Sequence, residues 1–174
     1  MVNAFSINLF LLFSAYSKKI LKKDIEILTP FPAFIPNHYI SDPGERLKQY
    51  KRLSNCETLT LLENIKDEFL DVYGLFSEEL SNLFVVLETR VYLQTLGLKS
   101  VQVGGSAITL KFDKSFLESN TQLRDRVVNF FISRPKIYQF TPDYRVIYNH
   151  KSPITQNDLL KFSKEICEHL VPSK

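Results

Sequence analysis

The sequence predicts an α+β fold, with about five helices packed on a small, mainly antiparallel sheet built from two hairpins. Apolar residues recur every three or four positions through residues 42–96, which is the period of a helix. They then alternate with a period of two on both sides of Gly104-Gly105, and again around Pro142-Asp143. The length of 174 residues, with 44% hydrophobic and 24% charged residues, is ordinary for one globular domain.

The composition argues against several kinds of metal, disulfide and nucleotide site. Cys56 and Cys167 lie far apart and lack CxxC spacing, which disfavours a disulfide scaffold and a cysteine-based zinc site and fits a reducing cytoplasm. The five glycines leave no room for a phosphate-binding loop or a dinucleotide fingerprint. The three histidines, His38, His150 and His169, do not have metal-ligand spacing. We therefore expect no catalytic residue, no cofactor, no metal and a cytoplasmic protein.

The first residues form a separate segment. We expect an N-terminal helix over residues 1–23, followed by one domain over residues 24–174. The apolar run is shorter than the ~20 residues of a membrane span, and no Lys or Arg precedes it as in a signal peptide. A packed helix is the preferred interpretation, with a signal peptide and attachment to a membrane through residues 1–16 as alternatives.

A short strand and a stiff connector come next. Residues 24–28, DIEIL, are predicted as the strand. Prolines at 30, 32 and 36 then impose an extended path, because proline disfavours helix at itself and just before itself. We expect Phe31, Phe34 and Ile35 to pack inward from this connector.

Several signals agree on a helix that starts at residue 42. Asp42 can cap it, Pro43 suits the first helical position, and Glu45 can complete a capping box. Its predicted apolar face consists of Leu47, Tyr50 and Leu53. The other side is basic and carries Arg46, Lys48, Lys51 and Arg52.

A second helix is predicted over residues 57–73 and ends at Gly74. Its apolar positions are Leu62, Ile65, Phe69 and either Val72 or Tyr73. Its polar side carries an acidic stripe, formed by Glu63, Asp67 and Asp71 at helical spacing and joined by Glu68. A basic helix is thus followed by an acidic one.

The rest of the chain supplies the remaining elements. Residues 78–96 predict the central and most buried helix, because their apolar positions cover more than one narrow stripe. The first hairpin is expected around Gly104-Gly105. Next come a helix over residues 121–133, a second hairpin with strands at 136–140 and 144–148, and a last helix over 156–170.

The two helices after Pro36 carry a motif. The pattern Y-I-x-D-x-x-x-R-L-x-x-Y-K-R-L, followed by L-x-x-I-K-x-E-F-L-D-x-Y-G, resembles the C-terminal domain of the bacterial transcription-repair coupling factor. The matching residues are Tyr39, Ile40, Asp42, Arg46, Leu47, Tyr50, Lys51, Arg52, Leu53, Glu68, Leu70, Asp71, Tyr73 and Gly74. The resemblance runs from about residue 24 to about residue 170 and weakens after Lys99.

The resemblance implies a function. In that family the domain is the last module of a motor protein that removes stalled RNA polymerase and recruits excision repair. It is an autoinhibitory clamp on the damage-recognition module, where it masks the surface that binds the repair ATPase. The family's acidic contacts correspond to Glu68 and Asp71, while Val72 stands where the family has Arg. The partner would be the damage-recognition module of the same or a companion protein, with Glu63 and Asp67 as further candidates.

One alternative function stays open at this stage. Lys48, Lys51 and Arg52, which we call the basic face, could contact phosphates and make the chain a small nucleic-acid-binding adaptor. The net charge of +3 neither demands nor excludes such a partner. Lys and Arg on the outer side of an amphipathic helix usually serve solubility, so we expect direct DNA contact to be absent.

Overall fold

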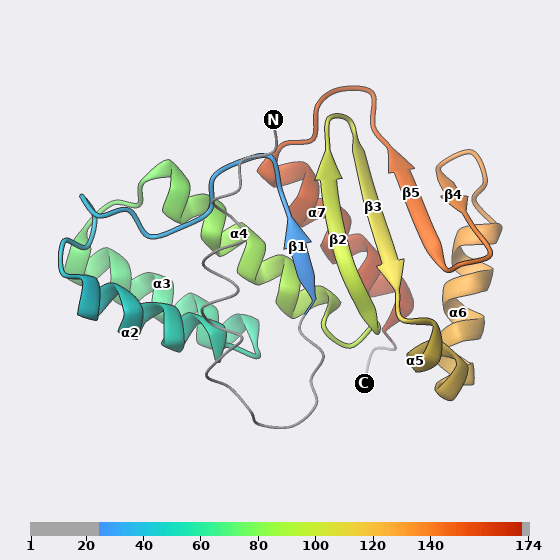
Figure 1. The fold of residues 1–174 in the computed structure, drawn as a ribbon, viewed down its shortest axis with the longest axis horizontal. Helices are drawn as coiled ribbons and strands as arrows, with labels where there is room; N and C mark the ends of the chain where they lie inside the picture. The colour runs from blue at the N-terminus through green and yellow to red at the C-terminus, as the bar shows by residue number, and fades with distance from the viewer. Residues whose placement is uncertain (1–24, 172–174) are drawn as a thin grey trace. The chain divides into compact units, whose positions relative to one another are not determined.

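The computed structural model describes residues 25–171 (Figure 1). The predicted N-terminal helix and its membrane and signal-peptide alternatives fall on residues 1–23, which lie outside the described residues. The chain divides into two compact units. Among the described residues, unit 1 comprises residues 25–30, Gln94–Ile154 and residues 168–171, and unit 2 comprises Phe31–Leu93 and Thr155–Cys167.

The described residues contain six helices and a five-stranded mixed sheet, so the α+β prediction is confirmed with small differences in the counts. Unit 2 contains α2 (Pro43–Ser54), α3 (Leu59–Tyr73) and α4 (Glu78–Leu93). Unit 1 contains β1 (Glu26–Leu28), β2 (Leu98–Gly104), β3 (Ala107–Phe112), α5 (Lys114–Ser119), α6 (Thr121–Ile132), β4 (Tyr138–Phe140) and β5 (Arg145–Asn149). The last helix, α7 (Gln156–Leu170), belongs to both units, because the division falls between Cys167 and Glu168.

Helix α2 begins as its sequence predicts. The Asp42 carboxylate accepts a hydrogen bond from the backbone N–H of Glu45 at 2.6 Å, and Pro43 is the first helical residue. The predicted apolar face is partly wrong. Leu53 is buried, but Leu47 is 50% exposed, and Gln49 is buried in its place. The buried side of the helix is therefore rotated relative to the prediction. Gln49 can be buried because its side chain forms hydrogen bonds with Glu45 and Arg52, and a pattern of apolar residues does not reveal such bonds.

Helices α3 and α4 build the core of unit 2. Leu62, Ile65 and Phe69 of α3 are buried as predicted, and Val72 is 62% exposed, so Tyr73 is the position that packs inward. Helix α4 ends at Leu93, three residues before the predicted end. Two buried polar residues of α4 were not predicted: Asn82, whose side-chain amide donates to the Pro32 carbonyl at 2.8 Å, and Thr89.

The proline-rich connector is hydrogen-bonded to the helices that follow it in unit 2. Ile35 is buried, and its backbone N–H donates to the Tyr50 hydroxyl at 2.7 Å. Phe34 is 39% exposed, so the expectation that it packs inward is wrong. Its backbone N–H instead donates to the Glu79 carbonyl, and this bond fixes the path of the chain.

The sheet of unit 1 has the strand order β1-β2-β3-β5-β4 (Figure 1). Both predicted hairpins are present as antiparallel pairs, β2 with β3 and β4 with β5. Strand β1, also predicted, pairs in parallel with β2, and β3 pairs with β5 to join the hairpins. The sheet is therefore mixed. The parallel pairing was not predicted, because the two strands lie far apart in sequence and their pairing leaves no local sequence signal.

An aromatic cluster stabilises one side of this sheet. Phe131 of α6 is fully buried, and its ring lies 5.0–6.2 Å from the rings of its neighbours. Those neighbours are Phe112, Phe130, Tyr138 and Phe140. Helix α5 was not predicted, although Asp113 caps it by accepting from the Phe116 N–H at 3.1 Å. Within the described residues, no helix combines the length and the apolar character needed to cross a membrane.

Candidate functional site

The helices α2 and α3, which carry the motif, are tied together at one end by Tyr39. Its hydroxyl donates to the carbonyl oxygens of Gly74 at 2.8 Å and Phe69 at 3.3 Å, and its ring stacks on Phe69. Gly74 ends α3 with a φ of 83°, a value that glycine adopts without the clash of a Cβ atom. The residues Tyr39, Tyr73 and Gly74 of the motif therefore close the helical pair.

A polar network runs between the two helices. The buried Gln49 amide donates to Glu45 Oε1 at 2.7 Å, and the same carboxylate accepts from the Tyr73 hydroxyl at 3.0 Å. Gln49 Oε1 in turn accepts from Arg52 Nη1 at 3.0 Å. The buried Gln49 amide both donates and accepts hydrogen bonds, so none of its polar atoms is left without a partner. The network therefore positions Arg52 without a destabilising unsatisfied group.

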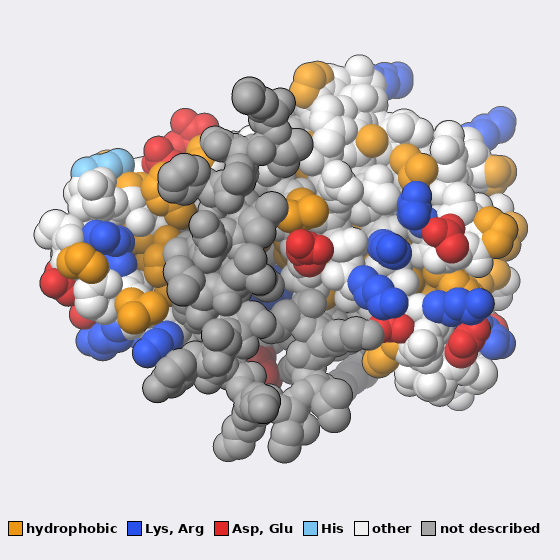
Figure 2. Space-filling model, in the orientation of Figure 1, with side chains coloured by type: hydrophobic (Ala, Val, Ile, Leu, Met, Phe, Trp, Pro, Cys, Tyr) orange, Lys and Arg blue, Asp and Glu red, His pale blue; other side chains and the backbone are white. Residues whose placement is uncertain are grey.

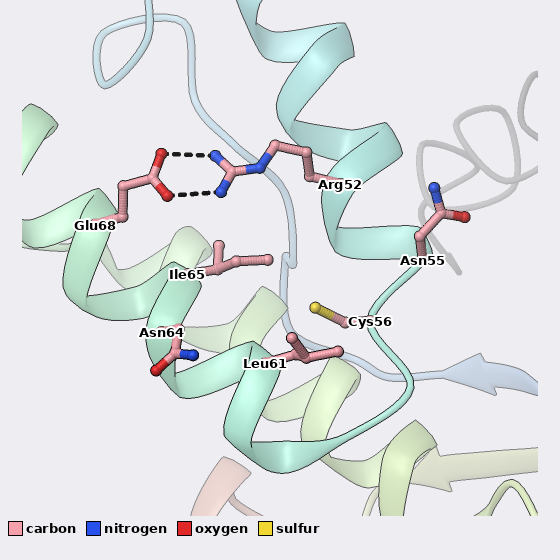
Figure 3. Close-up of a pocket in the computed structure, with 7 residues that line it drawn as sticks. All are labelled: Arg52, Asn55, Cys56, Leu61, Asn64, Ile65 and Glu68. Carbon is pink, nitrogen blue, oxygen red and sulfur yellow. Dashed lines mark hydrogen bonds and ion pairs between the residues drawn. The ribbon is translucent and has the colours of Figure 1, made fainter.

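Arg52 and Glu68 form a two-pronged ion pair. Arg52 Nη1 and Nη2 donate to Glu68 Oε1 and Oε2 at 2.8 and 2.6 Å (Figure 3). This hydrogen bond is the largest cause of the lowered pKa of Glu68 and of the raised pKa of Arg52. The basic face and the acidic stripe thus meet within the chain, and one member of each neutralises the other.

The acidic stripe divides into two kinds of carboxylate. Glu63 pairs with Lys66 at 2.9 Å, and Lys66 also pairs with Glu88 of α4. Glu68 pairs with Arg52. Asp67 and Asp71 are exposed, and within residues 25–171 neither forms an ion pair. Of the four predicted partner-binding residues, these two therefore offer carboxylates that no cation of the described chain neutralises.

Exposed apolar side chains flank the stripe. Four of the large exposed hydrophobic residues lie on α3 or directly after it: Leu61 at 50%, Leu70 at 41%, Val72 at 62% and Leu75 at 89% exposure. The helical spacing of Leu62, Ile65 and Phe69 places Leu70 away from the buried side, whereas Val72 was itself a candidate for that side and Leu75 lies beyond the helix. Exposed apolar groups that gather beside charges are typical of protein-binding surfaces.

A hollow of about 400 Å³ lies between α2 and α3, next to the ion pair. Figure 3 shows the side chains of Cys56, Leu61 and Ile65 pointing toward one another within it, with Arg52 and Glu68 along one side. Asn55 and Asn64 complete its rim. The floor is apolar and the rim is polar, an arrangement that suits a side chain of a bound protein.

Cys56 is the thiol that lines this hollow. Burial raises the pKa of the Cys56 thiol, and a thiol with a raised pKa is a poor nucleophile near neutral pH. Nowhere in the described part of the chain do three His, Cys, Asp or Glu residues gather in a way that could hold a metal.

The basic face carries less unneutralised positive charge than its sequence indicates. Arg52 is engaged by Glu68, and Lys48 Nζ lies 3.5 Å from Glu45 Oε2 on its own helix. Lys51 is exposed in the last turn of α2. Phosphate binding requires positive charge that is not already neutralised, so the observed ion pairs give the nucleic-acid alternative less support.

The fold defines an α+β domain, and comparisons with known proteins identify its family. Residues 29–123, more than half of the chain, match the family model described as TRCF domain, so the chain belongs to that family. The solved structure described as the C-terminal domain of transcription-repair coupling factor has the same fold, with a TM-score of 0.66 and 16% identity. That match covers 84% of this chain and 94% of the solved one.

Relatives in several bacteria are named transcription-repair-coupling factors. The chain is 26% identical over 118 residues to the protein of Rickettsia conorii, which covers 68% of this chain and 10% of the relative. It is 26% identical over 146 residues to the protein of Myxococcus xanthus, a match that covers 83% of this chain and 12% of the relative. It is 29% identical over 87 residues to the protein of Bacillus subtilis, a match that covers 50% of this chain and 7% of the relative. The chain thus matches only about a tenth of the length of these relatives.

Proposed function

We propose that this chain is a non-catalytic regulatory domain of a transcription-repair coupling factor, and that it acts in strand-specific nucleotide excision repair. It holds the damage-recognition module of the same or a companion protein as an autoinhibitory clamp and masks the surface that binds the repair ATPase. Through that clamp it acts indirectly on the ATPase and on RNA polymerase, and it works in the cytoplasm. Membership of the TRCF domain family supports this function.

One observation carries the location of the contact. Asp67 and Asp71 present exposed carboxylates, four residues apart on α3, beside the exposed side chains of Leu70 and Val72. A partner with Lys or Arg around an apolar centre complements this surface. Glu68 contributes less directly, because its carboxylate is already bound to Arg52 and binds a partner's cation only by sharing or exchange.

The energetics of such a surface suit a clamp that must open. An exposed ion pair contributes about 0–1 kcal/mol, so a few of them with some apolar contact hold the closed state by only a few kcal/mol. A motor that engages its substrate can overcome a difference of this size. Val72 in place of the family's Arg removes one charged contact and makes this clamp more apolar.

The first prediction tests this surface with a charge reversal. We expect Asp67→Lys with Asp71→Lys to weaken binding of the isolated damage-recognition module by about tenfold at low salt, with a smaller effect at moderate salt. The measurement is isothermal titration calorimetry on the full 174-residue chain. Circular dichroism shows whether the variant keeps the fold.

A matched variant separates the local effect from net charge. Glu118→Lys with Asp125→Lys makes the same charge change on exposed residues of unit 1. We expect this control to bind like the wild type. Equal affinity of all three proteins at both salt concentrations would contradict the proposed contact. The nucleic-acid-binding adaptor would be favoured instead if the chain bound duplex DNA in a salt-sensitive way and lost that binding with Lys48→Glu and Lys51→Glu.

A further inference from the structure

Within the described residues, one face of the sheet of unit 1 carries side chains that are exposed or partly exposed. Along β2 and β3 the side chains alternate, so that Val101 and Leu110 are buried while Gln102 and Lys111 are exposed. The outward set forms the open face, and the proposed clamp on unit 2 makes no use of it.

The strand register arranges the open face in two rows that cross four strands. The first row is charged at its ends and consists of Glu26, Ser100, Lys111 and Arg145. The second row consists of Leu28, Gln102, Thr109 and Ile147. Four adjacent strands span about 14 Å, and rows two residues apart are separated by about 7 Å. The eight side chains line a hollow of about 420 Å³.

Two cations lie directly opposite each other in the first row. Lys111 of β3 pairs in register with Arg145 of β5, and like charges at opposite positions of an antiparallel pair are destabilising. Asp143 lies 3.3 Å from Arg145, but both side chains stay about half exposed. No residue of the described chain forms an ion pair with Lys111, so one carboxylate serves two cations. Figure 2 shows Lys and Arg side chains gathered over the ends of β3 and β5.

The second row supplies uncharged contacts. The side chains of Gln102 and Thr109 form no hydrogen bond with the described residues, so their donors and acceptors face outward. Leu28 and Ile147 are half-buried apolar groups at the two ends of the row. An extended polypeptide placed over these rows finds cations for its carboxylates, hydrogen bonds for its backbone and apolar contacts for its other side chains.

The two rows contain no aromatic side chain. Sheets that bind single-stranded nucleic acid stack the bases on aromatic rings, and the carboxylate of Glu26 also repels phosphates. We propose that the open face of unit 1 is a second binding surface, which takes an acidic polypeptide segment whose carboxylates lie between Lys111 and Arg145. The cross-strand pair is then stabilised by the ligand, which explains why two cations share one position of the sheet.

The test uses the full chain and a defined probe. The probe is a fluorescein-labelled peptide with the sequence Glu-Leu-Glu-Ser repeated three times, and the same peptide with Lys for Glu is the charge control. We expect the acidic peptide alone to bind in fluorescence anisotropy, with affinity that falls as salt rises. In amide NMR spectra its addition should shift residues of β2, β3 and β5 at both rows.

Charge-reversal variants locate the contact. Lys111→Glu with Arg145→Glu should weaken peptide binding by about tenfold, since two exposed ion pairs are lost. Lys114→Glu with Lys136→Glu makes the same charge change outside the rows and should leave binding within twofold of the wild type. Where the first variant lowers the melting temperature, the milder Lys111→Gln with Arg145→Gln replaces it.

The outcomes are distinct. Shifts at both rows with selective loss in the first variant support the proposal. Equal losses in both double variants, an absence of peptide binding, or NMR shifts confined to unit 2 overturn it. Binding of single-stranded oligothymidylate in place of the peptide overturns the assignment of the partner. None of these results depends on the damage-recognition module, so the proposed clamp stands or fails separately.

Discussion

The two units of this chain carry opposite charge. In unit 2, Asp and Glu outnumber Lys and Arg by twelve to eight, whereas in the described part of unit 1 Lys and Arg outnumber Asp and Glu by nine to six. The overall charge of +3 conceals this difference. The net charge of the whole chain therefore does not describe its surface, because α3 exposes carboxylates and the open sheet face exposes cations.

The units also differ in what holds them together. Unit 1 buries an aromatic cluster around Phe131, in which neighbouring rings lie edge to face or stacked. Unit 2 has an apolar core as well, but its helices are joined by charged and polar side chains, from Tyr73 through Glu45 and Gln49 to Arg52. We expect unit 1 to be most sensitive to lost volume and unit 2 to be sensitive to lost charge pairs.

The largest effect is expected from removing the centre of the aromatic cluster. Phe131→Ala should lower the free energy of unfolding by about 3–5 kcal/mol, because it removes a fully buried ring and leaves a cavity. Urea unfolding followed by circular dichroism measures this loss. The adjacent Ile132→Ala is the control, since Ile132 is 59% exposed. Similar losses for the two variants would show that the cluster does not stabilise unit 1 as described.

The positions of these core residues could be predicted well from the sequence. The apolar periods place Phe130, Phe131 and Leu53 inside, and the capping residues and glycines place most element ends within a few residues. Helix α5 was missed because its six residues are too few for a periodic signal. The parallel pairing of β1 with β2 was missed because it joins residues about seventy positions apart.

An intermediate effect is expected from a charge pair in unit 2. Burial lowers the pKa of Lys66, but hydrogen bonds from Lys66 to Glu88 and Glu63 outweigh it, so the pKa lies above its usual value. Lys66→Met should cost about 1–3 kcal/mol, because the Glu88 side chain, only 12% exposed, is left without its cation.

Two further variants sharpen this result. Lys48→Met is the matched control, because the Lys48 side chain is 68% exposed and its pair with Glu45 should matter little. Adding Glu88→Gln to Lys66→Met should recover part of the loss in the same urea assay. If Lys48→Met and Lys66→Met are equally harmless, charge pairs do not distinguish unit 2 from unit 1.

The candidate site could be predicted only in part. The sequence identifies the residues of the acidic stripe and the basic face, since both follow from helical spacing. It does not reveal that Arg52 and Glu68 bind each other, because their contact depends on how α2 and α3 pack. The same packing buries Gln49 and exposes Leu47, which the apolar period alone predicts the other way round.

The smallest effect is a pH dependence that tests this ion pair. Hydrogen bonds from Arg52 lower the pKa of the Glu68 carboxyl below its usual value in the folded chain. A lowered carboxylate pKa stabilises the fold above the unfolded value, and this stabilisation is lost as the pH falls through the folded value. The difference in unfolding free energy between wild type and Glu68→Gln should therefore be constant near neutral pH and shrink below about pH 4.5.

The control removes the partner of Glu68. In an Arg52→Gln background, the additional change Glu68→Gln should give a difference that varies much less with pH. The exposure of both side chains keeps the effect small, so the comparison requires unfolding curves of high precision. A difference that keeps its pH dependence without Arg52 would assign the lowered pKa to another cause.

The edges of the sheet have a consequence for how this protein behaves at high concentration. Both outer strands of the described sheet, β1 and β4, are only three residues long. A foreign strand that adds to such an edge gains few ladder hydrogen bonds, so short edges discourage the strand-by-strand growth that leads to aggregates. The middle of the sheet is accessible while its borders offer little to a foreign strand, so association of two copies through β1 or β4 is disfavoured.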